Sequence, residues 1–338
     1  MSDLALDLAF HGDPAAVAAL AARAEERGVN GLFVAEATHD PYLTLGLASA
    51  ATQRISVGTS VAVAFARTPM ATAYSAWDVH RLSGGRLVLG LGSQIKPHIT
   101  RRYAMPWSDP AARMAEYVAA LRAIWACWQD GTALDFRGEY YEHTLMPPLF
   151  TPDPIDAGLP PVWLAAVGPR MLATAGAVAD GLLCHPLLSR SYLDEVVVPT
   201  VTAARVDGAR AGSRFTIATL CLVATGRTED DLAAAMVGVR RQIGFYASTP
   251  SYRPVLDHHG WGELHTEAHA LTKAGRWHEL GDLVDDEVLH TFAVVGDLEA
   301  ARAGLRARFA GAAERTCPSL PYDADADLGL DLVASDPS

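Results

Sequence analysis

Short apolar segments alternate with helical segments along most of this chain of 338 residues, and this alternation limits the folds open to it. Strands are predicted at residues 4–10, 31–37, 55–63, 86–92, 162–167, 181–187, 215–225 and 291–295. Helical patterns follow most of these strands, which is typical of βα units on a parallel sheet. Eight strands with this spacing favour a (β/α)8 TIM barrel over a doubly wound open sheet.

Two connections are much longer than the others: residues 94–160 after the fourth strand and residues 228–290 after the seventh. Long insertions that follow strands usually cover the active end of such a barrel. No linker or internal repeat interrupts the pattern, so residues 1–322 are predicted to form a single domain. The acidic tail, residues 323–338, is expected to be loosely ordered.

The overall charge argues against some classes of partner. With 39 acidic and 27 basic residues the net charge is -12, which disfavours nucleic acid and anionic membranes as partners. No apolar run is long enough to cross a membrane and the N-terminus does not resemble a secretory signal, so a cytoplasmic protein is expected. His265 and His269 lie one helical turn apart, but no third ligand has a suitable spacing, so no metal site is predicted.

Candidate site residues follow the predicted strands, because the active site of a barrel lies at the carboxyl ends of its strands. Glu36 and His39 follow the second strand and are candidates for acid–base chemistry. Glu36 could instead pair with an arginine at the rim, and His39 could bond within its own turn. Gly168, Pro169 and Arg170 open a helix, whose free N–H groups, with the Arg170 charge, would suit a phosphate.

Four stretches stand out in their order and spacing: G-L-F-V-A-E at 31–36, I-S-V-G-T-S-V at 55–61, L-S-G-G-R-L-V-L-G-L-G-S at 82–93 and P-V-W-L-A-A-V-G-P-R at 161–170. Together they resemble the luciferase-like monooxygenase superfamily and, within it, the coenzyme F420-dependent oxidoreductases. The resemblance implies a (β/α)8 barrel that binds a flavin or deazaflavin at its carboxyl face. It also implies a non-prolyl cis peptide between Ser60 and Val61, in a strand whose middle is unusually rich in small residues.

The same resemblance implies which residues contact the cofactor. They are Glu36, Ser60, Val61, Val63, Ser93, Gln94, His98, Val167, Gly168, Pro169 and Arg170. Related sugar-phosphate dehydrogenases have catalytic residues where this chain has Ala37 and Ile95, so a sugar phosphate is not the expected substrate. Acid–base chemistry is therefore assigned to His39, with Glu36 orienting it or polarising the cofactor. His39→Ala is expected to lower turnover and to leave cofactor affinity nearly unchanged.

Together these observations predict a bacterial oxidoreductase that transfers a hydride between coenzyme F420 and a small organic substrate. A homodimer or larger homo-oligomer is expected. Two alternatives stay open. One is an FMN-dependent monooxygenase supplied with reduced flavin by a separate reductase, since FMN and the deazaflavin share a ring shape and a phosphate. The other is a non-catalytic flavin-binding barrel.

Overall fold

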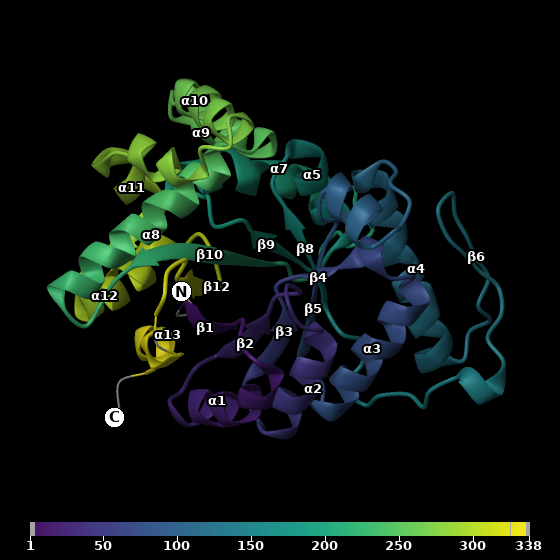
Figure 1. Cartoon of the computed structure of the whole chain (residues 1–338). Coiled ribbons are helices and arrows are strands. Elements are labelled where there is room, and N and C mark those ends of the chain that lie inside the picture. Colours follow the sequence, from purple (N-terminus) through teal and green to yellow (C-terminus); the bar gives the residue numbers. More distant parts are fainter. Residues whose placement is uncertain (1–3, 325, 336–338) are drawn as a thin grey trace.

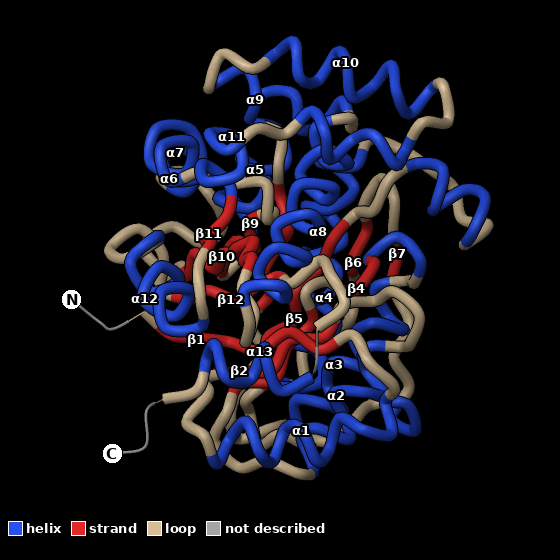
Figure 2. The backbone as a smooth tube through the Cα atoms, turned by 60° about the vertical axis from the view of Figure 1, so that its left-hand side comes forward, coloured by secondary structure: helices blue, strands red, loops and turns tan. Residues whose placement is uncertain are grey.

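In the computed structural model, which describes residues 4–324 and 326–335, eight parallel strands close into a barrel surrounded by helices (Figures 1 and 2). The barrel strands are β1 (Ala5–Phe10), β2 (Gly31–Val34), β3 (Ser56–Thr59), β5 (Leu87–Gly92), β8 (Val162–Ala166), β9 (Gly181–Cys184), β10 (Thr216–Ala224) and β12 (Arg315–Ser319). Strand β12 closes the circle, because it pairs in parallel with both β10 and β1. The predicted (β/α)8 barrel is confirmed.

Helices surround the barrel or, like α9 (Arg253–His258) and α10 (Gly262–Lys273), pack on the helices of an insertion. They are α1 (Pro14–Glu26), α2 (Pro41–Ala50), α3 (Pro69–Leu82), α4 (Pro110–Asp130), α5 (Pro169–Val178), α6 (Arg190–Tyr192), α7 (Val198–Arg205), α8 (Glu229–Ala247), α9 (Arg253–His258), α10 (Gly262–Lys273), α11 (Asp286–Phe292), α12 (Leu298–Arg308) and α13 (Ala326–Val333). Several begin with an aspartate cap and a proline; the Asp40 carboxylate, for example, accepts the N–H groups of Tyr42 and Leu43 at 2.9 and 3.0 Å. Among the described residues, no helix is both long enough and apolar enough to cross a membrane.

The eighth barrel strand is not the one predicted from the sequence. The predicted segment, residues 291–295, contains the short strand β11 (Ala293–Val295), which within the described part of the chain pairs only with the carboxyl end of β10. The closing strand β12 was missed because it contains Pro318, and proline, which has no N–H to donate, is unusual inside a sheet.

The two long insertions follow β5 and β10, as predicted. The first contains a hairpin of β6 (Phe136–Arg137) and β7 (Glu142–His143), which projects at the far right of Figure 1. Its turn is held to α4 because the Glu116 carboxylate accepts the N–H groups of Tyr140 and Tyr141, both at 2.7 Å. The second insertion contributes α8 to α11, which lie together at the upper left of Figure 1.

The acidic tail differs from the expectation of loose order. Within it, α13 packs against β1, β12 and α12, and the side chains of Leu330 and Leu332 are fully buried. Asp331 of this helix pairs with Arg27 at 2.7 Å and with Arg227 at 2.5 Å. The acidic residues therefore form one face of an amphipathic helix, and its leucines hold it on the barrel. Residues 325 and 336–338 lie outside the described part of the chain.

Two hydrophobic clusters stabilise the barrel. The larger one lies between the strands and the surrounding helices. The smaller one joins side chains from five strands, namely Phe33, Val88, Trp163, Leu183 and Ala218. A Cβ at Gly58 would lie only 2.5 Å from the Phe33 ring, so the glycine in β3 makes room for this aromatic side chain. This packing accounts for part of the run of small residues seen in the sequence.

Candidate active site

A cavity of about 670 Å³ lies at the carboxyl ends of the barrel strands. Its wall brings together predicted cofactor residues from three separate parts of the chain: Ser60, Val61 and Val63, then Ser93 and Gln94, then Val167 and Gly168. Glu36, His39, His98, Pro169 and Arg170 do not line it. The strand ends thus assemble much of the predicted site, but they leave both predicted catalytic side chains outside the cavity.

A cis peptide bond joins Ser60 to Val61, at the position implied by the family resemblance. It lies between β3 and the two-residue strand β4 (Ala62–Val63), and both residues line the cavity. The backbone around it is held on one side by β2, since Ser60 N–H donates to Val34 C=O at 2.8 Å and Glu36 N–H donates to Val61 C=O at 3.0 Å. The chain therefore bulges into the cavity at a fixed point.

Strand β5 lies beside this bulge and has glycines where side chains would collide with it. A Cβ at Gly92 would lie 2.7 Å from Cγ2 of Val61, and one at Gly90 would overlap the carbonyl oxygen of Thr59. The G-L-G-S segment at 90–93, which superficially suggests a nucleotide-binding motif, is thus explained by close backbone packing. At its end, Gln94 adopts a left-handed φ of 57°, a conformation unusual for a residue with a side chain.

Glu36 forms a buried ion pair with Arg67, the alternative that sequence reasoning left open. Its side chain is 7% exposed, and its Oε2 lies 2.7 Å from Nη1 of Arg67. The same carboxylate accepts the N–H of Val63 at 2.7 Å and the hydroxyl of Tyr103 at 3.2 Å. Arg67 also pairs with Asp40 at 2.8 Å. These contacts give Glu36 a structural role, because they hold β4 and the start of the following segment beneath the cavity.

This arrangement predicts that Glu36→Gln destabilises the protein. The change leaves the half-buried Arg67 with only Asp40 as a charged partner, so the free energy of unfolding should fall by about 2–3 kcal/mol. Chemical denaturation measures this difference. Glu142→Gln is the matched control, because Glu142 pairs with Arg137 where both side chains are more than 60% exposed, and it should change stability by less than about 0.5 kcal/mol.

His39 is exposed on the loop that follows β2, and His98 is exposed at the start of the short helical segment His98–Arg102 after β5. Neither ring has a hydrogen-bond partner among the described residues. The structure therefore does not bring His39 to the cavity wall or to Glu36, and its role as general acid or base stays a prediction.

The amino terminus of α5 opens onto the cavity. Val167, Gly168 and Met171 line the wall, and no side chain of the described residues caps the helix at Gly168. A Cβ at Gly168 would meet nothing within 4 Å, so there is open space beside the residue that precedes the helix. The Arg170 side chain is 71% exposed and pairs with Asp109 outside the cavity, and its guanidinium lowers the pKa of Asp109. The helix, more than the arginine, presents positive potential to the cavity.

The structure joins His185, Tyr246 and Tyr252 into an aromatic end of the cavity, a contact that sequence reasoning did not predict. His185 follows β9, while Tyr246 belongs to α8 and Tyr252 to the turn after it. The His185 ring stacks on Tyr252 with centroids 4.1 Å apart and meets Tyr246 edge-on at 4.5 Å. The sequence indicated His185 by a Cys-His-Pro segment after a predicted strand, and Tyr246 as an aromatic residue near the second insertion that could line a pocket. Nothing local connects that segment to tyrosines about 60 residues further along.

A barrel of eight strands with a cavity at their carboxyl ends is the architecture of a large class of proteins. Comparison with known sequences shows to which family of that class the chain belongs. The sequence profile of the luciferase-like monooxygenase family matches residues 5–315. The chain therefore belongs to the luciferase-like monooxygenase family.

Individual relatives agree with this membership. The chain is 49% identical over 315 residues to an uncharacterised protein of Mycobacterium tuberculosis, covering 93% of each. It is 31% identical over 325 residues to another M. tuberculosis protein, whose assignment as a coenzyme F420-dependent oxidoreductase is provisional, covering 88% of this chain and 89% of that protein. Among solved structures, the coenzyme F420-dependent tetrahydromethanopterin reductase of Methanopyrus kandleri has the same fold, with a TM-score of 0.76, 22% identity and coverage of 98% and 96%.

Proposed function

We propose that this protein is an oxidoreductase that transfers a hydride between coenzyme F420 and a small organic substrate. One observation carries the proposal: a single cavity joins the backbone bulge at Ser60–Val61 to the uncapped amino terminus of α5. A cofactor with a flat ring and a phosphate on its side chain needs a surface that supports the ring and a site that binds an anion. The bulge would provide the first and the helix terminus the second. The relative that is provisionally assigned as F420-dependent supports the choice of cofactor.

The residues present fit a deazaflavin. The phosphate would lie at Gly168, in the open space beside the start of α5, and the ring would lie against Val61. When bound, the cofactor would supply a carbon that gives or takes a hydride. The contribution of the chain is to bind the two reactants and to orient them in a cavity whose wall is otherwise largely apolar.

Titration of the purified protein with coenzyme F420 and with FMN tests the cofactor. We expect quenching of protein or cofactor fluorescence with a micromolar or lower dissociation constant for F420, and at least tenfold weaker binding of FMN. Tighter binding of FMN would favour the alternative of a monooxygenase that receives reduced flavin, which the family name supports. Binding of either cofactor without any turnover in a substrate screen would favour a non-catalytic barrel.

We further propose that the protein is cytoplasmic and forms a homodimer or a larger homo-oligomer. Three leucines on the outer face of α2 and at the end of α3 are exposed to solvent, Leu43 by 63%, Leu47 by 41% and Leu82 by 60%. Such side chains are more readily covered in a homodimer than left in water, and light scattering of the purified protein measures the oligomeric state.

A further inference from the structure

His185 lines the cavity, and one of its two ring nitrogens already has a hydrogen-bond partner within the protein. Its Nδ1 accepts the N–H of Leu187 at 3.1 Å. An accepting Nδ1 leaves the proton of a neutral imidazole on Nε2, which is then a hydrogen-bond donor. Among residues 4–324 and 326–335, no group bonds to Nε2, and this atom is not sealed from solvent. The ring lines the cavity, so the cavity is where that donor is available.

The surroundings of the ring keep it uncharged and fixed. Tyr252 stacks on one face and Tyr246 meets it edge-on, and burial in this setting lowers the pKa of His185 to about 3. The groups in contact with the ring are thus two phenols, and burial raises the pKa of both. A ring held between aromatic side chains has little rotational freedom, which preorganises its N–H.

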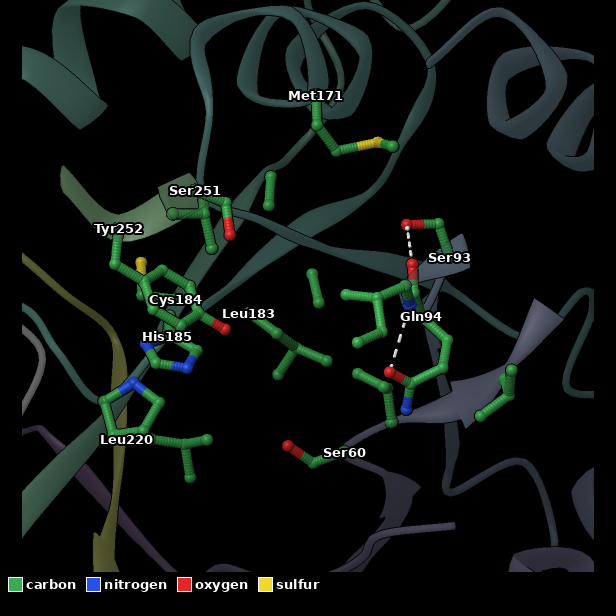
Figure 3. Close-up of a pocket in the computed structure, with 18 of the residues that line it drawn as sticks. Ser60, Ser93, Gln94, Met171, Leu183, Cys184, His185, Leu220, Ser251 and Tyr252 are labelled. Carbon is green, nitrogen blue, oxygen red and sulfur yellow. Dashed lines mark hydrogen bonds between the residues drawn. The ribbon is translucent and has the colours of Figure 1, made fainter. Parts of the chain in front are cut away.

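A second donor lies beside the first. Figure 3 shows the Tyr252 hydroxyl directed into the cavity next to the His185 ring, on the side opposite Ser93 and Gln94. This hydroxyl has no hydrogen-bond partner within the described part of the chain. The Nε2–H of His185 and the hydroxyl of Tyr252 are thus two neutral donors without a partner among the described residues. Buried donors are normally paired, so a bound molecule is expected to supply the acceptor atom.

The charge of the wall limits what that acceptor can be. Among its described residues the cavity wall includes no aspartate, glutamate or arginine, and its one lysine, Lys96, is exposed. Carboxylate and phosphate groups bind where cations or several charge-assisted donors meet them, and the aromatic end has neither. An uncharged oxygen on an apolar molecule, by contrast, matches a neutral N–H and a phenol.

We propose that His185 is a catalytic residue whose Nε2–H, together with the Tyr252 hydroxyl, binds the oxygen of an uncharged ketone or aldehyde. The substrate class is then a carbonyl compound and, in the opposite direction, its alcohol. This inference rests on the proposed function, because the hydride has to come from the bound cofactor.

The chemistry balances with groups already named. The carbonyl carbon gains a hydride, whose two electrons come from reduced deazaflavin, which is oxidised in the step. The π bond of the carbonyl breaks and its electron pair moves to oxygen, where the two donors stabilise the developing charge. A proton from solvent water completes the alcohol. His185 keeps its proton throughout, so it acts as an electrophile and not as a general acid.

The test uses the full-length protein, coenzyme F420, and acetone, cyclohexanone and acetophenone as probes. His185→Phe keeps an aromatic ring between Tyr246 and Tyr252 and removes the N–H. We expect its kcat for ketone reduction to fall at least 100-fold, while the dissociation constant of the cofactor, measured by fluorescence, changes less than twofold. Tyr252→Phe should cost about tenfold. His278→Gln, at an exposed histidine outside the cavity, should match the wild type.

A spectroscopic measurement separates polarisation of the carbonyl from packing. Isotope-edited infrared spectra of cyclohexanone bound beside oxidised cofactor, a pair that cannot react, should show a lowered carbonyl stretching frequency in the wild type. The shift should be absent in His185→Phe and partly retained in Tyr252→Phe. If His185→Phe does not fold, His185→Ala provides the same test, and added imidazole should restore turnover and the shift.

Three results would contradict the inference, each in a different way. A kcat of His185→Phe within threefold of the wild type, or an unchanged carbonyl shift, would remove His185 from the reaction and leave the proposed function in place. Tight F420 binding with no reduction of any of the three ketones would overturn the carbonyl class alone. Failure to bind F420 at all would overturn the proposed function itself, and the inference with it.

Discussion

Gly168→Asp should weaken cofactor binding at least 100-fold, which corresponds to about 2.7 kcal/mol of binding free energy. The residue has φ -81° and a Cβ would meet nothing within 4 Å, so the fold tolerates a side chain there. An aspartate at this position would accept the free N–H groups of α5 and would place a negative charge where we expect the phosphate. Fluorescence titration of the variant with F420 measures the loss.

Two properties make this variant informative. An aspartate at the helix cap should stabilise the folded protein by about a few tenths of a kcal/mol relative to glycine, so weaker binding could not be attributed to misfolding. Gly168→Asn is the matched control, because it fills the same space and caps the helix without a charge. We expect the asparagine variant to bind the cofactor at least tenfold more tightly than the aspartate variant. Equal affinities for both variants would place the phosphate elsewhere.

Gly90→Ala should lower the free energy of unfolding by about 3 kcal/mol or more, as overpacking against backbone does. Its methyl group would overlap the carbonyl oxygen of Thr59 and would lie 2.6 Å from Cδ1 of Leu183. Strands β3 and β5 would have to separate, and Thr59 directly precedes the Ser60–Val61 bulge, so cofactor affinity should fall as well. Guanidinium denaturation and cofactor titration give the two readouts.

The same substitution elsewhere should have the opposite sign. Gly46 lies inside α2, where an added Cβ would be 4.0 Å from the Leu82 side chain. Gly46→Ala should therefore stabilise the protein by up to about 1 kcal/mol, through helix propensity alone. If both alanine variants unfolded at the same denaturant concentration as the wild type, the close contact between β3 and β5 would be wrong.

Much of the fold could be predicted from the pattern of apolar, capping and turn residues along the chain. Apolar strands, aspartate–proline helix starts and glycine stops recur often enough to predict the barrel and its two insertions. The predictions from local pattern were wrong in two places. Strand β12 was not predicted because it contains Pro318, and helix α13 was not predicted because acidic residues surround its buried leucines.

By itself the sequence determined the order of the units and the helix start at Gly168, because strands and helix starts are properties of contiguous residues. The bulge at Ser60–Val61 was implied by the resemblance of several motifs to one family. Only the tertiary structure decided which side chains face the cavity. It paired Glu36 with Arg67, left His39 outside, and brought His185, which follows β9, against Tyr252 from a distant insertion. Contacts of this kind depend on how the barrel closes and on how the insertions fold over it. Neither can be predicted from the spacing of residues that are close in the sequence.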